Sequence, residues 1–123
     1  MRKKILPFIR RIRKLEEERA RILDGLLAAK PLIRGSLSFV KRTCGKETCH
    51  CAKKPAHEAW VLMTTQEGQR RCQVLRQEDV ETVRELVETY RTFRAALRKL
   101  KAIQTKEEGI LRGILERRAQ PYQ

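Results

Sequence analysis

The chain has 123 residues, with 29 Lys and Arg against 15 Asp and Glu, and a formal net charge of +14 at pH 7. So large a charge on so short a chain favours a polyanionic partner, nucleic acid before an acidic membrane surface. The apolar residues lie in stripes more than in blocks, which argues against a large globular core. No apolar run is long enough to cross a bilayer and no secretory signal is recognisable, so we expect a cytoplasmic protein without a membrane partner.

Residues 1–33 predict a basic coiled-coil helix. Their apolar residues follow the alternating three- and four-residue spacing of a heptad seam: Ile5, Phe8, Ile12, Leu15, Ile22, Leu26, Ala29 and Ile33. We expect the helix to begin near Pro7, because proline suits a first turn, and to end near Lys30, which precedes Pro31. Arg19 occupies a seam position, where a polar residue either lays its stem across the interface or fixes the register of the pair.

Residues 34–76 predict a small three-stranded antiparallel sheet. Branched and aromatic residues are concentrated in three stretches, 37–40, 59–65 and 70–76. The linker 66–69 contains a glycine and predicts a hairpin loop between the second and third strands. A sheet of this size is marginal alone, so we expect a metal ion and packing against helix ends to stabilise it.

Helical spacing returns at residue 77. Residues 77–104 carry a second heptad seam, formed by Val83, Leu86, Tyr90, Phe93, Leu97 and Leu100. The seam positions turn polar at Gln104 and Glu107, and Thr105 with Glu108 has the form of a capping box. We therefore expect a separate short amphipathic helix and a tail in residues 105–123.

Three of the four cysteines lie within eight residues, and a histidine follows six residues later. Thiolate and imidazole are the ligands that a tetrahedral zinc ion selects, and clustered cysteines in a reducing compartment more often bind metal than form disulfides. The predicted Zn²⁺ ligands are Cys44, Cys49, Cys51 and His57, with Cys72 as the alternative fourth ligand. We expect a closed structural site, because no water-activating glutamate stands beside it, and we assign no catalytic residue and no enzymatic activity.

These elements together predict a mainly α fold with a small β insert. Neither long helix can bury its stripe alone, so the two seams should pair, within one chain or between two chains of a homodimer. The expected architecture is an antiparallel coiled-coil helical hairpin that carries a zinc-stabilised three-stranded sheet at its closed end.

The run C-G-K-x-x-C-x-C-A that begins at Cys44, followed by His57, a hairpin and the helix from Val80, resembles an uncharacterised family of small bacterial and archaeal proteins. The likeness covers about residues 32–100. Members of that family are often encoded near transposons and other mobile elements, so the resemblance implies an accessory role in a mobile element. It also implies that the three clustered cysteines and His57 form the shared ligand set. Residues 58–60 depart from the family, with Glu-Ala-Trp in place of Gly-Pro-Tyr.

The insert at 34–76 holds nine basic and three acidic residues, a net charge of +6. Basic side chains on a rigid module would contact phosphates of DNA or RNA in a salt-dependent, weakly sequence-selective way. The predicted contact residues are Lys41, Arg42, Lys46, Lys53, Lys54, Arg70, Arg71 and Arg76. Trp60 and Phe39 are able to stack on bases, although packing within the sheet is the plainer role for both. The alternative function is a coiled-coil adapter or dimerisation module that binds a protein partner and has a purely structural zinc site.

Overall fold

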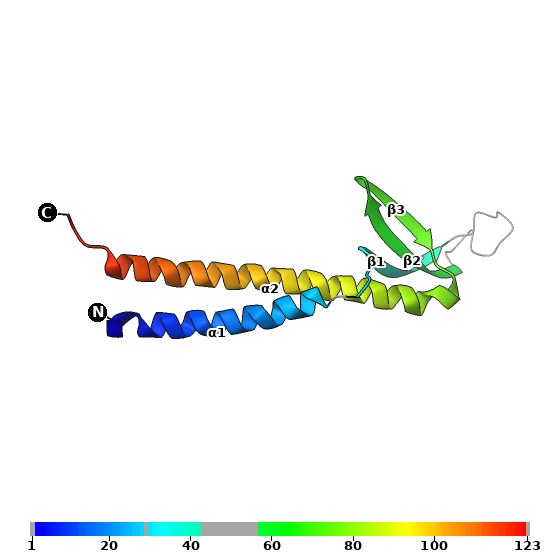
Figure 1. The fold of residues 1–123 in the computed structure, drawn as a ribbon. Helices are drawn as coiled ribbons and strands as arrows, with labels where there is room; N and C mark the ends of the chain where they lie inside the picture. The colour runs from blue at the N-terminus through cyan, green and yellow to red at the C-terminus, as the bar shows by residue number, and fades with distance from the viewer. Residues whose placement is uncertain (1, 29, 43–56, 123) are drawn as a thin grey trace. The chain divides into compact units, whose positions relative to one another are not determined.

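The computed structural model describes residues 2–28, 30–42 and 57–122. In chain order the elements are α1 (Arg2–Leu27), β1 (Gly35–Arg42), β2 (His57–Gln66), β3 (Gln69–Val74), the 3₁₀ turn η2 (Gln77–Asp79) and α2 (Val80–Arg118) (Figure 1). The prediction of a mainly helical fold with a three-stranded antiparallel sheet is confirmed. The chain divides into two compact units, residues 1–29 with 93–123 and residues 30–92.

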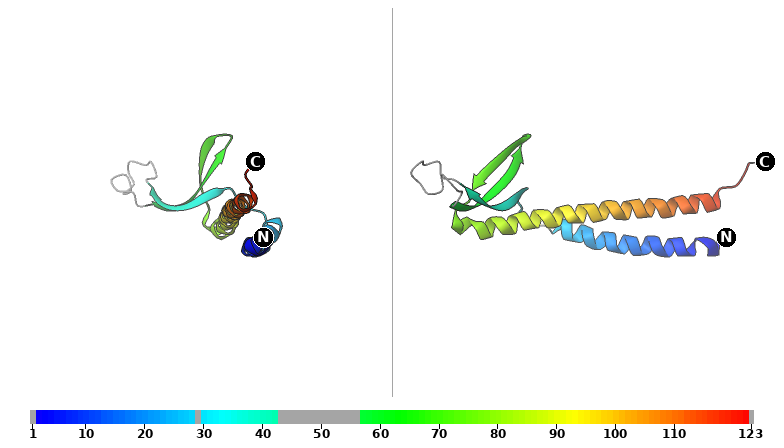
Figure 2. Two further views of the ribbon diagram at one scale, coloured as in Figure 1. Left: turned by 90° about the vertical axis from the view of Figure 1, so that its left-hand side faces the viewer. Right: turned by 180° about the vertical axis from the view of Figure 1, so that it is seen from behind.

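In the first unit, α1 lies alongside the C-terminal part of α2 and runs in the opposite direction (Figure 1, Figure 2). Phe8 lies beside Arg117 near the chain ends, with the guanidinium carbon 5.0 Å from the ring centroid. Further along the pair, Glu16 faces Glu107. Within α1 the predicted seam residues are the less exposed ones, because Ile5 is buried and the later positions are half-buried: Phe8, Ile12, Leu15, Arg19, Ile22 and Leu26.

The predicted bounds of the N-terminal helix are wrong by several residues at its start. Because α1 begins at Arg2, Pro7 lies inside the helix and not in its first turn. Proline cannot donate the backbone hydrogen bond to the carbonyl four residues earlier, which normally weakens a helix. Burial of Ile5, 7% exposed, offsets that loss by giving the first turn an apolar contact within the helix pair.

The predicted break at residue 105 is also wrong, since α2 is one helix of 39 residues. The hydroxyl of Thr105 donates to the backbone carbonyl of Lys101 over 3.1 Å, inside the helix, and caps nothing. The seam continues through this point, because Ile103, Glu107 and Ile110 are all buried at heptad spacing. Burial along the seam therefore keeps the helix intact where local capping signals favour a new start.

The second unit contains the sheet, whose strand order is β1-β2-β3 with both pairings antiparallel. The register places Phe39 directly opposite Trp60. Glu67 and Gly68 connect β2 to β3 with positive φ angles of 51° and 79°, which is the pattern of a type I′ turn. The predicted hairpin loop is therefore confirmed.

The core of the second unit is formed by the central strand and the first turns of α2. Val61 and Leu62 are 2% and 7% exposed although adjacent strand residues point to opposite faces, so β2 is covered on both sides at this point. Val80 and Val87 of α2 are buried as well. The backbone N–H of Ile33 donates to the carbonyl of Leu86 over 3.1 Å and thereby ties the segment before β1 to α2.

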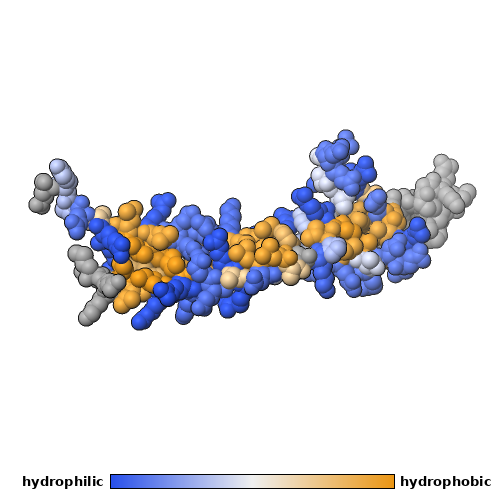
Figure 3. Space-filling model, viewed as in Figure 1, coloured by the Kyte–Doolittle hydropathy of each residue, from blue (hydrophilic) through white to orange (hydrophobic). Residues whose placement is uncertain are grey.

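Apolar side chains also reach the surface. On the face drawn in Figure 3 they gather over the beginning of α1 and the end of α2 within the first unit. Leu111 and Leu115 of α2 are 55% and 68% exposed, and Leu6 of α1 is 43% exposed. Over the described residues, neither helix combines the length and apolar character needed to cross a membrane.

Candidate functional site

The predicted metal site is mostly outside the described residues. The positions concerned, for ligands and phosphate contacts alike, are Cys44, Cys49, Cys51, Lys46, Lys53 and Lys54. His57 is the first residue of β2 and pairs with Arg42, the last residue of β1. These two strand ends therefore bracket the segment 43–56 that carries the cysteine cluster.

Cys72, the alternative ligand, lies elsewhere on the sheet. It is an exposed, free cysteine on β3, and it pairs with Met63, six residues after His57 along β2. At the usual rise per strand residue, that separation is about 20 Å. Across residues 2–28, 30–42 and 57–122, no three His, Cys, Asp or Glu side chains are grouped closely enough to hold a metal ion.

The basic residues predicted on the third strand are freely accessible. All six residues of β3 are exposed, and Arg70 and Arg71 pair with Thr65 and Thr64 of β2. As strand neighbours, the two arginines point to opposite faces of the sheet. Both faces of this edge strand therefore carry a positive charge.

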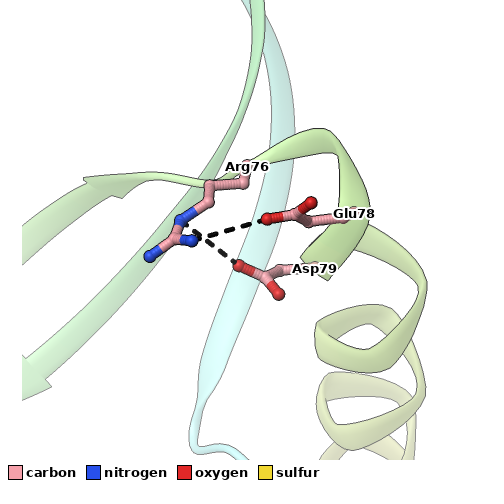
Figure 4. A network of polar contacts seen from close by, with 3 residues as sticks. All are labelled: Arg76, Glu78 and Asp79. Carbon is pink, nitrogen blue, oxygen red and sulfur yellow. Dashed lines mark hydrogen bonds and ion pairs between the residues drawn. The ribbon is translucent and has the colours of Figure 1, made fainter.

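Two further predicted contact residues, Lys41 and Arg76, are partly offset by carboxylates. Lys41 is exposed on β1 but stands directly opposite Glu58 of β2. Arg76 Nη1 lies 3.4 Å from Glu78 Oε1, and Arg76 Nε lies 4.0 Å from Asp79 Oδ2 (Figure 4). Contacts between such exposed charges are weak, about 0–1 kcal/mol, but they lower the local positive potential. Arg70 and Arg71 are therefore the predicted contact residues best placed to meet phosphate.

An aromatic and cationic cluster lies on the sheet near α2. The rings of Phe39 and Trp60 have centroids 5.0 Å apart and are tilted by 47°. The guanidinium carbon of Arg84 lies 4.9 Å from the Trp60 ring centroid, a cation–π arrangement. Phe39 is 52% exposed, while Trp60 is half-buried. Packing within the sheet thus accounts for Trp60 but for only part of Phe39.

A partly open cavity of about 200 Å³ adjoins this cluster. Its walls come from β1, β2 and α2: Ser36, Leu37, Trp60, Arg84, Val87, Glu88 and Arg91. Arg91 Nη1 lies 3.8 Å from Glu88 Oε2. Arg84 and Arg91 are not among the predicted site residues, although their seven-residue spacing puts them on the same face of one helix.

The chain matches the model of a protein family. The model of a family described as a domain of unknown function, DUF6788, matches residues 7–85, more than half of the chain. The chain belongs to this family. The DUF6788 match includes most of α1, all three strands and the first turn of α2, so it contains Phe39, Trp60 and Arg84 but ends before Arg91.

Membership of DUF6788 supports the resemblance to an uncharacterised family, although the match begins earlier and ends earlier than the likeness at 32–100. The cysteine motif and the association with mobile elements stay predictions. No match to the chain is found among curated proteins or among solved structures.

Proposed function

We propose that this chain is a small basic zinc-binding protein that binds nucleic acid as an accessory factor of a mobile element. The observation that carries the proposal is the edge strand β3, whose residues are all exposed and which presents Arg70 and Arg71 on its two faces in a chain of net charge +14. Arginine is well suited to phosphate because its planar guanidinium donates several hydrogen bonds. A strand of this kind favours contact with the backbone over reading of bases.

The zinc part of the proposal rests on the donor set and on the sheet register. Three thiols and one imidazole match the ligands of structural zinc sites. Cys44 is two residues beyond Arg42, a stretch that spans at most about 7 Å. Because Arg42 pairs with His57, while Cys72 is about 20 Å away along β2, the register favours His57 as the fourth ligand. A zinc ion bound there would cross-link the adjoining ends of β1 and β2.

Nucleic-acid binding of this type is salt-dependent, because each phosphate contact releases condensed counterions. We expect the protein to bind generic duplex or single-stranded DNA or RNA at low salt and to lose affinity steeply as salt rises. Replacing Arg70 and Arg71 by glutamine should flatten the plot of log affinity against log salt by about one unit per lost contact. Replacing Arg112 and Arg118, two exposed arginines of α2, by glutamine gives a matched control with the same change of charge.

A titration of salt against binding, followed by mobility shift or fluorescence anisotropy, therefore tests the proposal. Absence of binding to any nucleic acid at low salt would eliminate it. The Arg70 and Arg71 variants test the binding surface separately. If the slope of log affinity against log salt is unchanged in them, β3 is not part of the interface.

A second candidate function is a coiled-coil adapter or dimerisation module with a purely structural zinc site. The observation in its favour is the exposed apolar surface of α2, where Leu97, Leu111 and Leu115 are 49%, 55% and 68% exposed. Contiguous patches of exposed apolar residues mark protein interaction sites more often than scattered ones do. Sedimentation equilibrium, combined with the salt titration, distinguishes the two candidate functions. A stable homodimer that does not bind nucleic acid would favour the adapter.

A further inference from the structure

We propose that the Phe39 ring and the adjoining cavity form a site for single-stranded nucleic acid, in which one base stacks on Phe39 and a neighbouring phosphate contacts Arg84 or Arg91. This inference rests on the proposed function and specifies its substrate class. It also adds residues of β1 and α2 to the basic edge strand.

Phe39 is unusually exposed for an aromatic residue of a small sheet. An aromatic residue of so small a sheet would normally contribute to its core, yet more than half of Phe39 is in contact with solvent. Trp60 holds the ring from one side at a centroid distance of 5.0 Å, and Arg84 lies over Trp60 in turn. The outer surface of Phe39 is therefore an aromatic platform held in place by its neighbours, the device on which bases stack without regard to sequence.

Two arginines, Arg84 and Arg91, line the cavity and give it positive charge. Arg84 and Arg91 each have a glutamate partner three residues earlier on the same helix, Glu81 and Glu88. The side chains of Arg91 and Glu88 are 74% and 65% exposed, so this pair adds little to stability. A phosphate that offers two oxygens to a guanidinium is a stronger partner than a solvated carboxylate at 3.8 Å. Arg91 can thus exchange its glutamate for a phosphate at small cost, while Arg84 adds positive charge at the cavity wall.

Stacking on Phe39 favours single strands over duplexes. Bases in a duplex are stacked on one another and offer only their edges, whereas an unpaired base presents its face to a platform such as Phe39. The cavity, at about 200 Å³, is of a size to accept a single group of a nucleotide and not a double helix. Lys41 lies two residues after Phe39 on the same face of β1 and is exposed, but Glu58 stands opposite and partly offsets its charge.

The test uses the intrinsic fluorescence of the full chain. Trp60 is the only tryptophan, so its emission reports on this cavity alone. The probes are a short oligothymidylate, a short oligouridylate, a mixed-sequence duplex and a sugar–phosphate strand that lacks bases. We expect saturable quenching by the two base-bearing single strands, and an affinity about tenfold lower for the strand without bases.

Two variants locate the contacts. Phe39→Leu keeps an apolar side chain and should reduce the affinity for oligothymidylate about tenfold, whereas Val74→Ala, at a residue 53% exposed on β3, should leave it unchanged. Arg91→Gln should weaken binding more than Arg98→Gln, which makes the same change of charge on the same helix outside the cavity. Since Arg91 is exposed, its variant keeps the test decisive if Phe39→Leu disturbs folding.

The outcomes distinguish this site from the function on which it rests. Binding of nucleic acid with unchanged Trp60 emission, equal affinity for strands with and without bases, and no effect of either variant would overturn the site and leave the proposed function standing. Failure of every probe to bind at low salt would overturn both.

Discussion

The carboxyl group of Glu107 on α2 faces that of Glu16 on α1 within the helix pair. Glu107 is only 8% exposed, and its Oε1 atom has no hydrogen-bond partner in the part of the chain that the structure describes. Burial, followed by the hydrogen bond and the negative charge of Glu16, raises the pKa of Glu107 above its ordinary value of 4.5, and the positive charge of Arg19 opposes the shift. A titrating group thus lies in the seam that joins the helices.

This relationship predicts a pH-dependent stability. Because the pKa of Glu107 is higher in the folded than in the unfolded chain, the folded state binds the proton more tightly. The resulting stabilisation is fully present below pH 4.5 and is lost as pH rises through the folded pKa. Glu107→Gln should therefore raise the free energy of unfolding at neutral pH and flatten its fall above pH 4.5. Urea unfolding followed by circular dichroism over a pH series measures both effects.

The control for that experiment is Glu116→Gln, which removes an exposed carboxylate from the same helix. Because the substitution is at an exposed position, it should change the free energy of unfolding by at most about 0.5 kcal/mol. Identical slopes for Glu107→Gln and the parent protein would mean that Glu107 titrates as an ordinary surface glutamate.

Two glycines of α2 offer a matched pair of substitutions. A Cβ atom at Gly109 would meet nothing within 4 Å among the described residues, so Gly109→Ala should stabilise the protein by about 1 kcal/mol through helix propensity alone. A Cβ atom at Gly113 would lie 3.3 Å from Phe8 Cε1, so crowding should cancel part of the same gain. Thermal and urea unfolding of the two variants give the difference. Equal gains would mean that α1 does not press against α2 at Phe8.

Gly35, at the start of β1, should not tolerate a side chain. A Cβ atom there would lie 2.8 Å from the carbonyl oxygen of Met63 and 2.9 Å from Cγ2 of Thr64. The first of these is a backbone atom that can move only with β2, so Gly35→Ala should destabilise the protein by about 1–3 kcal/mol. Gly25→Ala on α1, where a Cβ meets open space among the described residues, should have the opposite sign. A neutral or stabilising Gly35→Ala in urea unfolding would contradict the close approach of the two strands.

The helices illustrate what the sequence specifies and what it leaves to packing. The seam from Ile5 to Leu26 is predictable, because a regular heptad spacing of apolar residues dictates which face is buried. The helix ends are not predictable in this way. Pro7 and Thr105 are local signals for the start of a helix, and burial of Ile5 and Ile110 overrides them. Capping and proline preferences amount to about 1–3 kcal/mol, which a well-packed seam can exceed.

The candidate site shows the same division. The strands and their hairpin follow from β propensity and from Gly68, so the exposure of Arg70 and Arg71 on an edge strand is within reach of sequence analysis. The cluster of Arg84 with Trp60 is not, because 24 residues separate the two and only the packing of α2 against the sheet brings them together. Contacts of this kind depend on tertiary register, which local periodicity does not encode.

The predicted zinc ligands can be tested one at a time. Cys44→Ser and His57→Ala should each lower the zinc content of the purified protein from about one ion per chain to a small fraction of that, because a tetrahedral structural site needs all four ligands. Cys72→Ser should retain full occupancy, since Cys72 pairs with Met63, about 20 Å along β2 from His57. Elemental analysis of the three variants beside the parent protein measures the occupancy.

A chelator should have a parallel effect on folding. If zinc binds as proposed, its loss would remove the cross-link between the ends of β1 and β2, and the sheet, too small to be stable alone, should unfold at a lower urea concentration than in the zinc-loaded protein. The chelator should have no further effect on Cys44→Ser, which has already lost the ion. If His57→Ala keeps its zinc while Cys72→Ser loses it, the fourth ligand is Cys72, and the strand register inferred from Arg42 and His57 does not govern the site.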